Sequence, residues 1–122
     1  MAKILLVDDA ESLTTVFATA LKTAGYEIVT AADGKSGLEK AKSEKPQFIL
    51  LDQVLPDIQG NEILQTLKSD AETQNIPVAM LSNFGQDELI KAAINAGAAD
   101  YILKYQIEPQ DLVNKVKGFI TT

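Results

Sequence analysis

Carboxylate side chains follow two fully apolar segments of this 122-residue sequence. Asp8 and Asp9 come directly after residues 4–7, and Asp52 comes directly after residues 48–51. Carboxylates that are packed together repel one another, so at least one of their pKa values rises unless a cation is bound. Mg²⁺ prefers a few carboxylates together with water and a substrate phosphate, and a carboxylate can itself attack phosphorus. The three acids therefore favour Mg²⁺-dependent phosphoryl chemistry.

Two further polar side chains, Ser82 and Lys104, follow later apolar segments. In phosphoryl chemistry the ammonium would neutralise phosphoryl oxygens and the hydroxyl would donate a hydrogen bond to one of them. Each residue also has an ordinary structural explanation. A single Asp after a strand commonly caps the next helix, a single Ser commonly lies in a turn, and a single Lys is usually solvated. Capping does not readily explain two adjacent acids plus a third, so the whole set is interpreted as functional.

The composition excludes several other kinds of chemistry. The sequence has 11 Lys and Arg residues against 17 Asp and Glu residues, a formal charge of −6, and it has no Cys and no His. Disulfides, thiolate catalysis, Ser-His-Asp triads and HExxH zinc sites are therefore ruled out. The acidic balance disfavours nucleic acid and anionic membranes as partners. Neither a membrane span nor a signal peptide is expected, so we expect a cytoplasmic protein.

Apolar runs alternate with amphipathic segments along the chain. The runs predict five strands, at residues 4–7, 26–30, 48–51, 77–81 and 101–103. The helical spacing of apolar residues predicts five helices, within residues 13–24, 38–41, 63–67, 89–94 and 109–120. Gly25 is expected just after the first helix and Gly97 just after the fourth, and Pro109 suits the first turn of the last.

Five β/α units without a linker or a repeat predict one α/β domain over residues 1–122. Continuous apolar strands separated by helices imply a parallel sheet that helices cover on both faces, and right-handed crossovers make it doubly wound. In such a fold ligands bind at the carboxyl ends of the strands. The polar residues after strands one, three, four and five should therefore converge, and residues 56–60, directly after the third strand, are a candidate functional loop.

In these features the sequence resembles the receiver domain of bacterial two-component response regulators, the chemotaxis-regulator-like fold. The resemblance covers nearly the whole chain. It is carried by residues 4–9 (ILLVDD), residues 50–60 (LLDQVLPDIQG), Ser82, and residues 96–101 (AGAADY) leading to Lys104. The spacings of 30 residues from Asp52 to Ser82 and of 22 residues from Ser82 to Lys104 also fit. The resemblance implies a flavodoxin-like five-stranded sheet in the order 2-1-3-4-5.

The resemblance also implies roles for the acidic residues. Asp52 would be the phosphoacceptor and would attack a phosphohistidine on a partner histidine kinase or phosphotransfer protein. Asp9 would bind Mg²⁺ directly, Asp8 would help through water, and the backbone carbonyl of Val54 would complete the protein ligands, together with Asp52.

The remaining site residues would transmit the signal. Lys104 would pair with the phosphoryl group and Ser82 would hydrogen-bond to it. Movement of Ser82, with Tyr101 turning inward behind it, would change the surface formed by the fourth helix, the fifth strand and the fifth helix, where a downstream protein would bind. Taken alone, a tyrosine such as Tyr101 is more often half-buried packing with its hydroxyl in water.

Some positions depart from the usual pattern of this family. Asn83 stands where a small residue is common, Phe84 follows it, and Val54 stands where many relatives carry a polar group. We hypothesise that these three side chains hinder the hydrolytic water and lengthen the life of the aspartyl phosphate, with ordinary loop packing as the alternative. Tyr105 follows Lys104 where Pro with a cis bond is common. A cis bond before a residue other than proline costs about 3 kcal/mol, so a trans bond is the alternative.

Several functions are compatible with this set of residues. The leading one is a phosphorylation-switched signalling module that is not a turnover enzyme. A phosphorylation-independent interaction module and a Mg²⁺-dependent aspartate-nucleophile phosphatase are alternatives, although the phosphatase would usually carry a second acid at Val54. A flavin- or nucleotide-binding domain would need a phosphate-binding loop where Asp8 and Asp9 stand. The protein is expected to act alone, in a relay or as part of a longer regulator, as a monomer or a phosphorylation-dependent dimer.

Overall fold

The structure is a computed structural model that describes residues 2–83 and 85–120. Strands and helices alternate along the chain in the order β1 (Lys3–Val7), α1 (Glu11–Thr23), β2 (Glu27–Ala31), α2 (Gly34–Ser43), β3 (Phe48–Asp52), α3 (Gly60–Ser69), β4 (Val78–Ser82), α4 (Asp87–Asn95), β5 (Asp100–Leu103) and α5 (Pro109–Phe119). This alternation confirms the predicted five β/α units.

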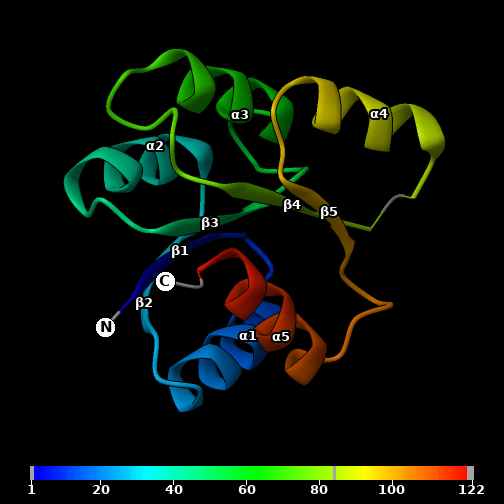
Figure 1. The fold of residues 1–122 in the computed structure, drawn as a ribbon. Helices are drawn as coiled ribbons and strands as arrows, with labels where there is room; N and C mark the ends of the chain where they lie inside the picture. The colour runs from blue at the N-terminus through cyan, green and yellow to red at the C-terminus, as the bar shows by residue number, and fades with distance from the viewer. Residues whose placement is uncertain (1, 84, 121–122) are drawn as a thin grey trace.

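The five strands form one parallel sheet in the order β2-β1-β3-β4-β5, as the resemblance implied. Helices α2, α3 and α4 cover one face of this sheet, and α1 and α5 cover the other (Figure 1). Every residue of β3 and of β4 is buried. These strands read as continuous apolar runs because helices lie on both of their faces. Alternate residues of the strands enter two separate core clusters, one on each side of the sheet.

Two glycines end helices as the sequence predicted. Gly25 has φ +103° and Gly97 has φ +107°, in the left-handed region that L residues rarely adopt. After α1, the N–H of Gly25 donates to the carbonyl of Lys22, and the N–H of Tyr26 donates to that of Leu21. The same two-bond pattern follows α4 at Gly97. These are Schellman motifs, which satisfy carbonyls at a helix end.

The structure moves some of the predicted boundaries. Helix α2 begins at Gly34, well before the predicted residue 38, because Asp33 caps it by accepting a 2.7 Å hydrogen bond from the N–H of Ser36. Strand β4 begins at Val78, since Pro77 has no N–H to contribute to the sheet. Strands β3 and β4 each extend one residue further than predicted, to Asp52 and Ser82. Within the described residues, no helix is long and apolar enough to cross a membrane.

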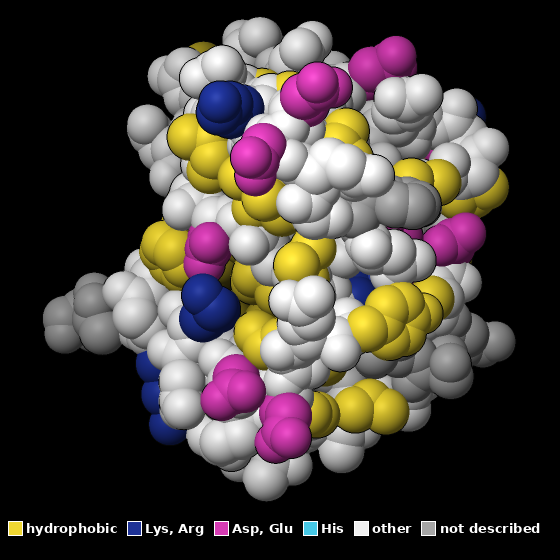
Figure 2. Space-filling model, turned by 90° about the vertical axis from the view of Figure 1, so that its right-hand side faces the viewer, with side chains coloured by type: hydrophobic (Ala, Val, Ile, Leu, Met, Phe, Trp, Pro, Cys, Tyr) yellow, Lys and Arg dark blue, Asp and Glu magenta, His cyan; other side chains and the backbone are white. Residues whose placement is uncertain are grey.

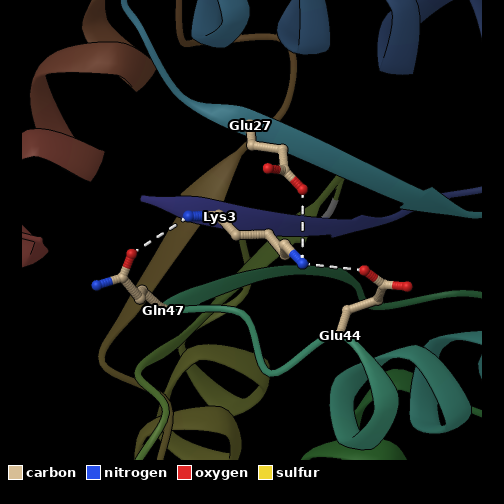
Figure 3. Close-up of polar contacts among 4 residues, drawn as sticks. All are labelled: Lys3, Glu27, Glu44 and Gln47. Carbon is tan, nitrogen blue, oxygen red and sulfur yellow. Dashed lines mark hydrogen bonds and ion pairs between the residues drawn. The ribbon is translucent and has the colours of Figure 1, made fainter. Parts of the chain in front are cut away.

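A polar cluster closes the end of the sheet opposite the carboxyl ends of its strands (Figure 3). The Lys3 ammonium lies 3.0 Å from Glu44 Oε1 and 3.5 Å from Glu27 Oε2. Two hydrogen bonds also connect Lys3 with Gln47. The backbone N–H of Lys3 donates to Gln47 Oε1 over 3.3 Å, and the N–H of Gln47 donates to the Lys3 carbonyl over 2.8 Å. Residue 3 therefore joins β1, β2 and the segment between α2 and β3.

Candidate functional site

Three carboxylates meet at the carboxyl ends of β1 and β3. Asp8 follows β1 and is buried, Asp9 is exposed beside it, and Asp52 is the buried last residue of β3. One oxygen from each carboxylate lies within 4.8 Å of the other two. Because β1 and β3 are adjacent parallel strands, their carboxyl ends reach the same edge of the sheet. Figure 2 views this end of the molecule, where acidic side chains are interspersed with hydrophobic ones.

Lys104 supplies the positive charge of the cluster. Its ammonium lies 3.0 Å from Asp8 Oδ2 and 3.0 Å from Asp52 Oδ2, and all three side chains are almost completely buried. The backbone places Lys104 there, since its N–H donates to the carbonyl of Ser82 over 2.9 Å and so continues the pairing of β4 with β5. One ammonium thus bridges two carboxylates in a region that largely excludes water.

Burial and charge shift the pKa values in this cluster. Burial raises the pKa of Asp52 to about 6, and the neighbouring charge of Asp8 adds to this effect against the opposing contacts with Lys104. Burial acts to lower the pKa of Lys104, but its contacts with Asp8 and Asp52 together outweigh this, so the pKa is raised. At neutral pH Asp52 is therefore mostly ionised and Lys104 is fully charged.

The donor set fits a hard divalent cation. Among the described residues, the buried Asp8 Oδ2 has one close polar partner, the Lys104 ammonium at 3.0 Å. Asp52 Oδ1 has one long contact of 3.3 Å, from the N–H of Val54. Three carboxylates against one ammonium leave an excess of negative charge and unused lone pairs. Carboxylate oxygens in such an arrangement are suitable ligands for Mg²⁺.

Helix capping does not explain the acidic residues. The N-cap of α1 is Ala10 and that of α3 is Gln59, and neither makes a side-chain capping bond. The Asp8 carboxylate does accept a 2.8 Å bond from the N–H of Ala10, but only through Oδ1. The capping alternative for Asp9 and Asp52 is therefore wrong.

A cavity of about 260 Å³ opens over the cluster. Its lining comprises Asp9, Ala10, Asp52, Gln53, Val54, Ser82, Asn83, Lys104 and Tyr105. The structure thus brings together five of the seven predicted site residues in one cavity, with Asp8 beneath it. Tyr101 lies elsewhere, in a cavity of about 490 Å³ between β5 and α5. Its predicted role is in the switch, away from the reacting atoms.

The structure also shows how the departures from the family pattern lie. Val54 and Tyr105 are exposed at the rim of the cavity, with 57% and 76% of their surfaces accessible, and Asn83 is exposed beside them. Phe84 lies outside the described residues, so the hypothesis of a hindered hydrolytic water stays a prediction. No peptide bond in the described part of the chain is cis, so the bond from Lys104 to Tyr105 is trans.

Sequence reasoning missed two residues near the site. Gln53 is 7% exposed, lines the cavity, and has a buried Oε1 atom that finds no hydrogen-bond partner within the described part of the chain. Asp57 lies in the loop after Asp52, and its carboxylate bonds to the first turn of α2. Position alone could have drawn attention to Gln53, which directly follows Asp52. The contact between Asp57 and α2 spans more than 20 residues and has no local sequence signal.

Comparisons with known proteins agree with this geometry. The response regulator receiver domain family matches residues 4–117. The chain is 35% identical over 118 residues to the alkaline phosphatase synthesis transcriptional regulatory protein PhoP of Bacillus subtilis, covering 97% of this chain and 48% of that protein. It is 36% identical to the phosphate regulon transcriptional regulatory protein PhoB of Pseudomonas aeruginosa, covering 96% of this chain and 51% of that protein. The chain thus spans about half the length of these relatives.

Solved structures share the whole fold. A chemotaxis protein CheY4 of Vibrio cholerae superposes with a TM-score of 0.91 at 29% identity, covering 98% of this chain and 99% of that one. A response regulator from Chloroflexus aurantiacus superposes with a TM-score of 0.91 at 31% identity, covering 99% and 98% of the two chains. The chain belongs to the response regulator receiver domain family.

Proposed function

We propose that Asp52 accepts a phosphoryl group from a phosphohistidine of a partner histidine kinase or phosphotransfer protein. The observation that carries this proposal is the placement of its carboxylate, 3.0 Å from the Lys104 ammonium and beside two further carboxylates, at an open cavity. An oxygen of Asp52 forms the new O–P bond, the N–P bond of the phosphohistidine breaks, and the imidazole nitrogen keeps the electron pair. An ionised carboxylate is required, which a pKa of about 6 provides at neutral pH.

The neighbouring residues have separate tasks in this step. Asp9, Asp8, Asp52 and the backbone carbonyl of Val54 would hold Mg²⁺, which when bound neutralises charge on the phosphoryl oxygens. Lys104 provides a second, fixed positive charge there. The Ser82 hydroxyl, at the end of β4 in the same cavity, hydrogen-bonds to the phosphoryl group.

Phosphorylation would be passed on as a signal through a change in one surface of the protein. In our proposal the movement of Ser82 toward the phosphoryl group, with Tyr101 turning inward, changes the surface of α4, β5 and α5, to which a downstream protein binds. Phosphorylation then favours an arrangement that the protein already samples. The protein is a switch and assists only its own phosphorylation and dephosphorylation. The exposed apolar Val54 stands where an aspartate-nucleophile phosphatase would need an acid, which supports this view.

The test is intact mass after incubation with acetyl phosphate and MgCl₂. We expect the wild type to gain one phosphoryl group, Asp52→Asn to gain none, and the wild type in EDTA to gain none. Asp33→Asn is the matched control, because Asp33 also follows a strand but lies outside the carboxylate cluster. Phosphorylation of Asp52→Asn would contradict the assignment of the acceptor. No gain in any sample would favour a phosphorylation-independent interaction module.

A further inference from the structure

The loop after the phosphoacceptor, residues 53–59, is held firmly at both ends. At its start, the N–H of Gln53 donates to the carbonyl of Leu81 over 2.8 Å, and at its end, the N–H of Gly60 donates to the carbonyl of Gln53 over 2.9 Å. Leu55 anchors the loop in the core, being 8% exposed. Val54, whose carbonyl is a proposed metal ligand, lies between these anchors. The position of this carbonyl therefore depends on how the rest of the loop is held.

The middle of the loop is held by the carboxylate of Asp57. Its Oδ1 accepts hydrogen bonds from the N–H groups of Gly34, over 2.7 Å, and of Ile58, over 2.9 Å. Its Oδ2 accepts a hydrogen bond from the N–H of Lys35 over 3.0 Å. Gly34 and Lys35 are the first two residues of α2, whose N–H groups have no partner within the helix. These hydrogen bonds hold the pKa of Asp57 below its usual value, and the bond from Gly34 has the largest effect.

The start of α2 packs tightly against the same loop. A Cβ added at Gly34 would lie 2.7 Å from Ile63 Cδ1 of α3 and 3.1 Å from both Ile58 Cβ and Asp57 Oδ1. A methyl group at Gly34 would fit only if these side chains moved. The loop is therefore held between the first turn of α2 and α3, with the Asp57 carboxylate as the polar connection.

We propose that Asp57 is a positioning residue for the metal site, because it ties the loop that bears Val54 to the first turn of α2. This inference rests on the proposed function, since it concerns the same Mg²⁺ site. Asp57 touches neither the cation nor the phosphoryl group. It acts through the backbone of the loop. The affinity for Mg²⁺ therefore depends on the position of α2 against the loop.

The chain offers a matched control for this proposal. Asp33 caps the same helix through Ser36, so its loss should weaken α2 in a similar way. Its capping bond is local, three residues along the chain, and it does not hold the loop after Asp52. A comparison of Asp57→Ala with Asp33→Ala therefore separates the position of the loop from the stability of the helix.

The experiment is an NMR titration of ¹⁵N-labelled protein with MgCl₂, following the amides of residues 52–55 and 57–60, with urea unfolding of each variant. We expect both variants to be less stable than the wild type. Only Asp57→Ala should also bind Mg²⁺ more weakly, by about tenfold, the lower end of the range for residues that orient metal ligands. Asp57→Asn, which keeps one acceptor oxygen, should fall between. With acetyl phosphate, Asp57→Ala should need more MgCl₂ yet reach close to the wild-type rate at saturation.

Two results would overturn the inference. Wild-type Mg²⁺ affinity in Asp57→Ala would show that the other anchors suffice, and an equal loss in Asp33→Ala would show that only the stability of α2 matters. Failure of the wild type itself to bind Mg²⁺ would overturn the proposed function, and the inference with it. The wild-type titration thus separates the two failures.

Discussion

The pairing of one ammonium with two buried carboxylates determines how the site behaves at the scale of single residues. Lys104 bridges Asp8 and Asp52, with both distances at 3.0 Å. Removing one member of such a set leaves a buried charge without full compensation. The fold nevertheless favours the neutral form of the Asp52 carboxyl group over the ionised form, as its raised pKa shows. Without a bound cation, its ionisation therefore works against folding.

We predict that Asp52→Asn stabilises the protein at pH 7 in EDTA. The pKa of Asp52 is about 6 in the folded protein, against an ordinary value of 3.8 for an aspartate side chain, so the folded state binds this proton more tightly. Its contribution to the free energy of unfolding falls as pH rises from about 4 to about 6, and the loss is complete above that range. Asn cannot ionise, so the variant should be more stable at pH 7 by roughly 1–3 kcal/mol. Urea unfolding at pH 4 and pH 7 measures this, and a less stable variant at pH 7 would contradict it.

The buried side-chain oxygen of Gln53, which has no hydrogen-bond partner within residues 2–83 and 85–120, leads to a second prediction at this scale. A buried amide oxygen without a partner costs about 1–3 kcal/mol, and Gln53 Oε1 is such an atom. Gln53→Leu should therefore raise the free energy of unfolding by about 1 kcal/mol. Gln65→Leu, at an exposed position of α3, is the control and should change it by less than about 0.5 kcal/mol. Equal changes in the two variants, measured by urea unfolding, would refute the explanation.

The residue types of the site could be predicted from the sequence, but some of their contacts could not. Asp8, Asp9, Asp52, Ser82 and Lys104 each follow an apolar run, and the fold rule for parallel sheets brings such residues together. The bonds from Asp57 to α2 depend on how two loops meet in three dimensions. Neither periodicity nor motif reports such contacts, so Asp57 was missed while its loop, residues 56–60, was recognised.

At the scale of elements, the close approach of α3 to the end of β3 fixes the geometry of the site. Helix α3 begins at Gly60, and a Cβ there would collide with the carbonyl oxygen of Asp52 and lie 2.8 Å from Gln53 Cα. Only glycine allows this approach, which is why a glycine closes the loop after the phosphoacceptor.

We predict that Gly60→Ala is destabilising and impairs phosphorylation. The backbone around Asp52 must shift to admit the methyl group, which should cost about 1–3 kcal/mol. The control is Gly118→Ala in α5, where a Cβ would meet nothing within 4 Å. That change should stabilise the protein by about 0.5–1 kcal/mol, since alanine is the better helix former. Urea unfolding and the rate of acetyl phosphate labelling test both, and near-neutral behaviour of Gly60→Ala would contradict the prediction.

The sequence was sufficient to predict which segments form helices and which form strands, but it predicted the residues at which they begin and end less well. The strands β1, β3 and β4 have apolar runs that admit few other interpretations. Helix α2 was predicted too short because its first turn has few apolar residues, and the caps from Asp33 and Asp57 supply what periodicity did not show. Tertiary contacts decided this boundary.

At the scale of the whole molecule, the acidic cluster couples metal binding to folding. The three carboxylates lie at the carboxyl ends of β1 and β3, which are neighbouring strands of the sheet, so they come together only in the folded chain. A ligand that binds only the folded state stabilises it by mass action. Mg²⁺ should therefore raise the stability of the entire protein.

We predict that MgCl₂ at about ten times its dissociation constant raises the free energy of unfolding by roughly 1.4 kcal/mol. NaCl at the same ionic strength is the control for general screening, and Asp9→Asn should lose most of the effect. Thermal unfolding followed by circular dichroism measures the shift. An equal rise with NaCl would assign the effect to relief of repulsion among the acidic side chains.

The two ends of the described chain lie near the same residue, Gln47, away from the phosphoryl site. Gln47 bonds to Lys3 at the start of β1, and it also lines a cavity of about 330 Å³ with Phe119 and Ile120 at the end of α5. Figure 1 shows both ends on the side away from the carboxyl ends of the strands. A short linker that joins them, with new ends opened between the exposed residues Ala71 and Glu72 after α3, would give a circular permutant that keeps every residue of the phosphorylation site in place.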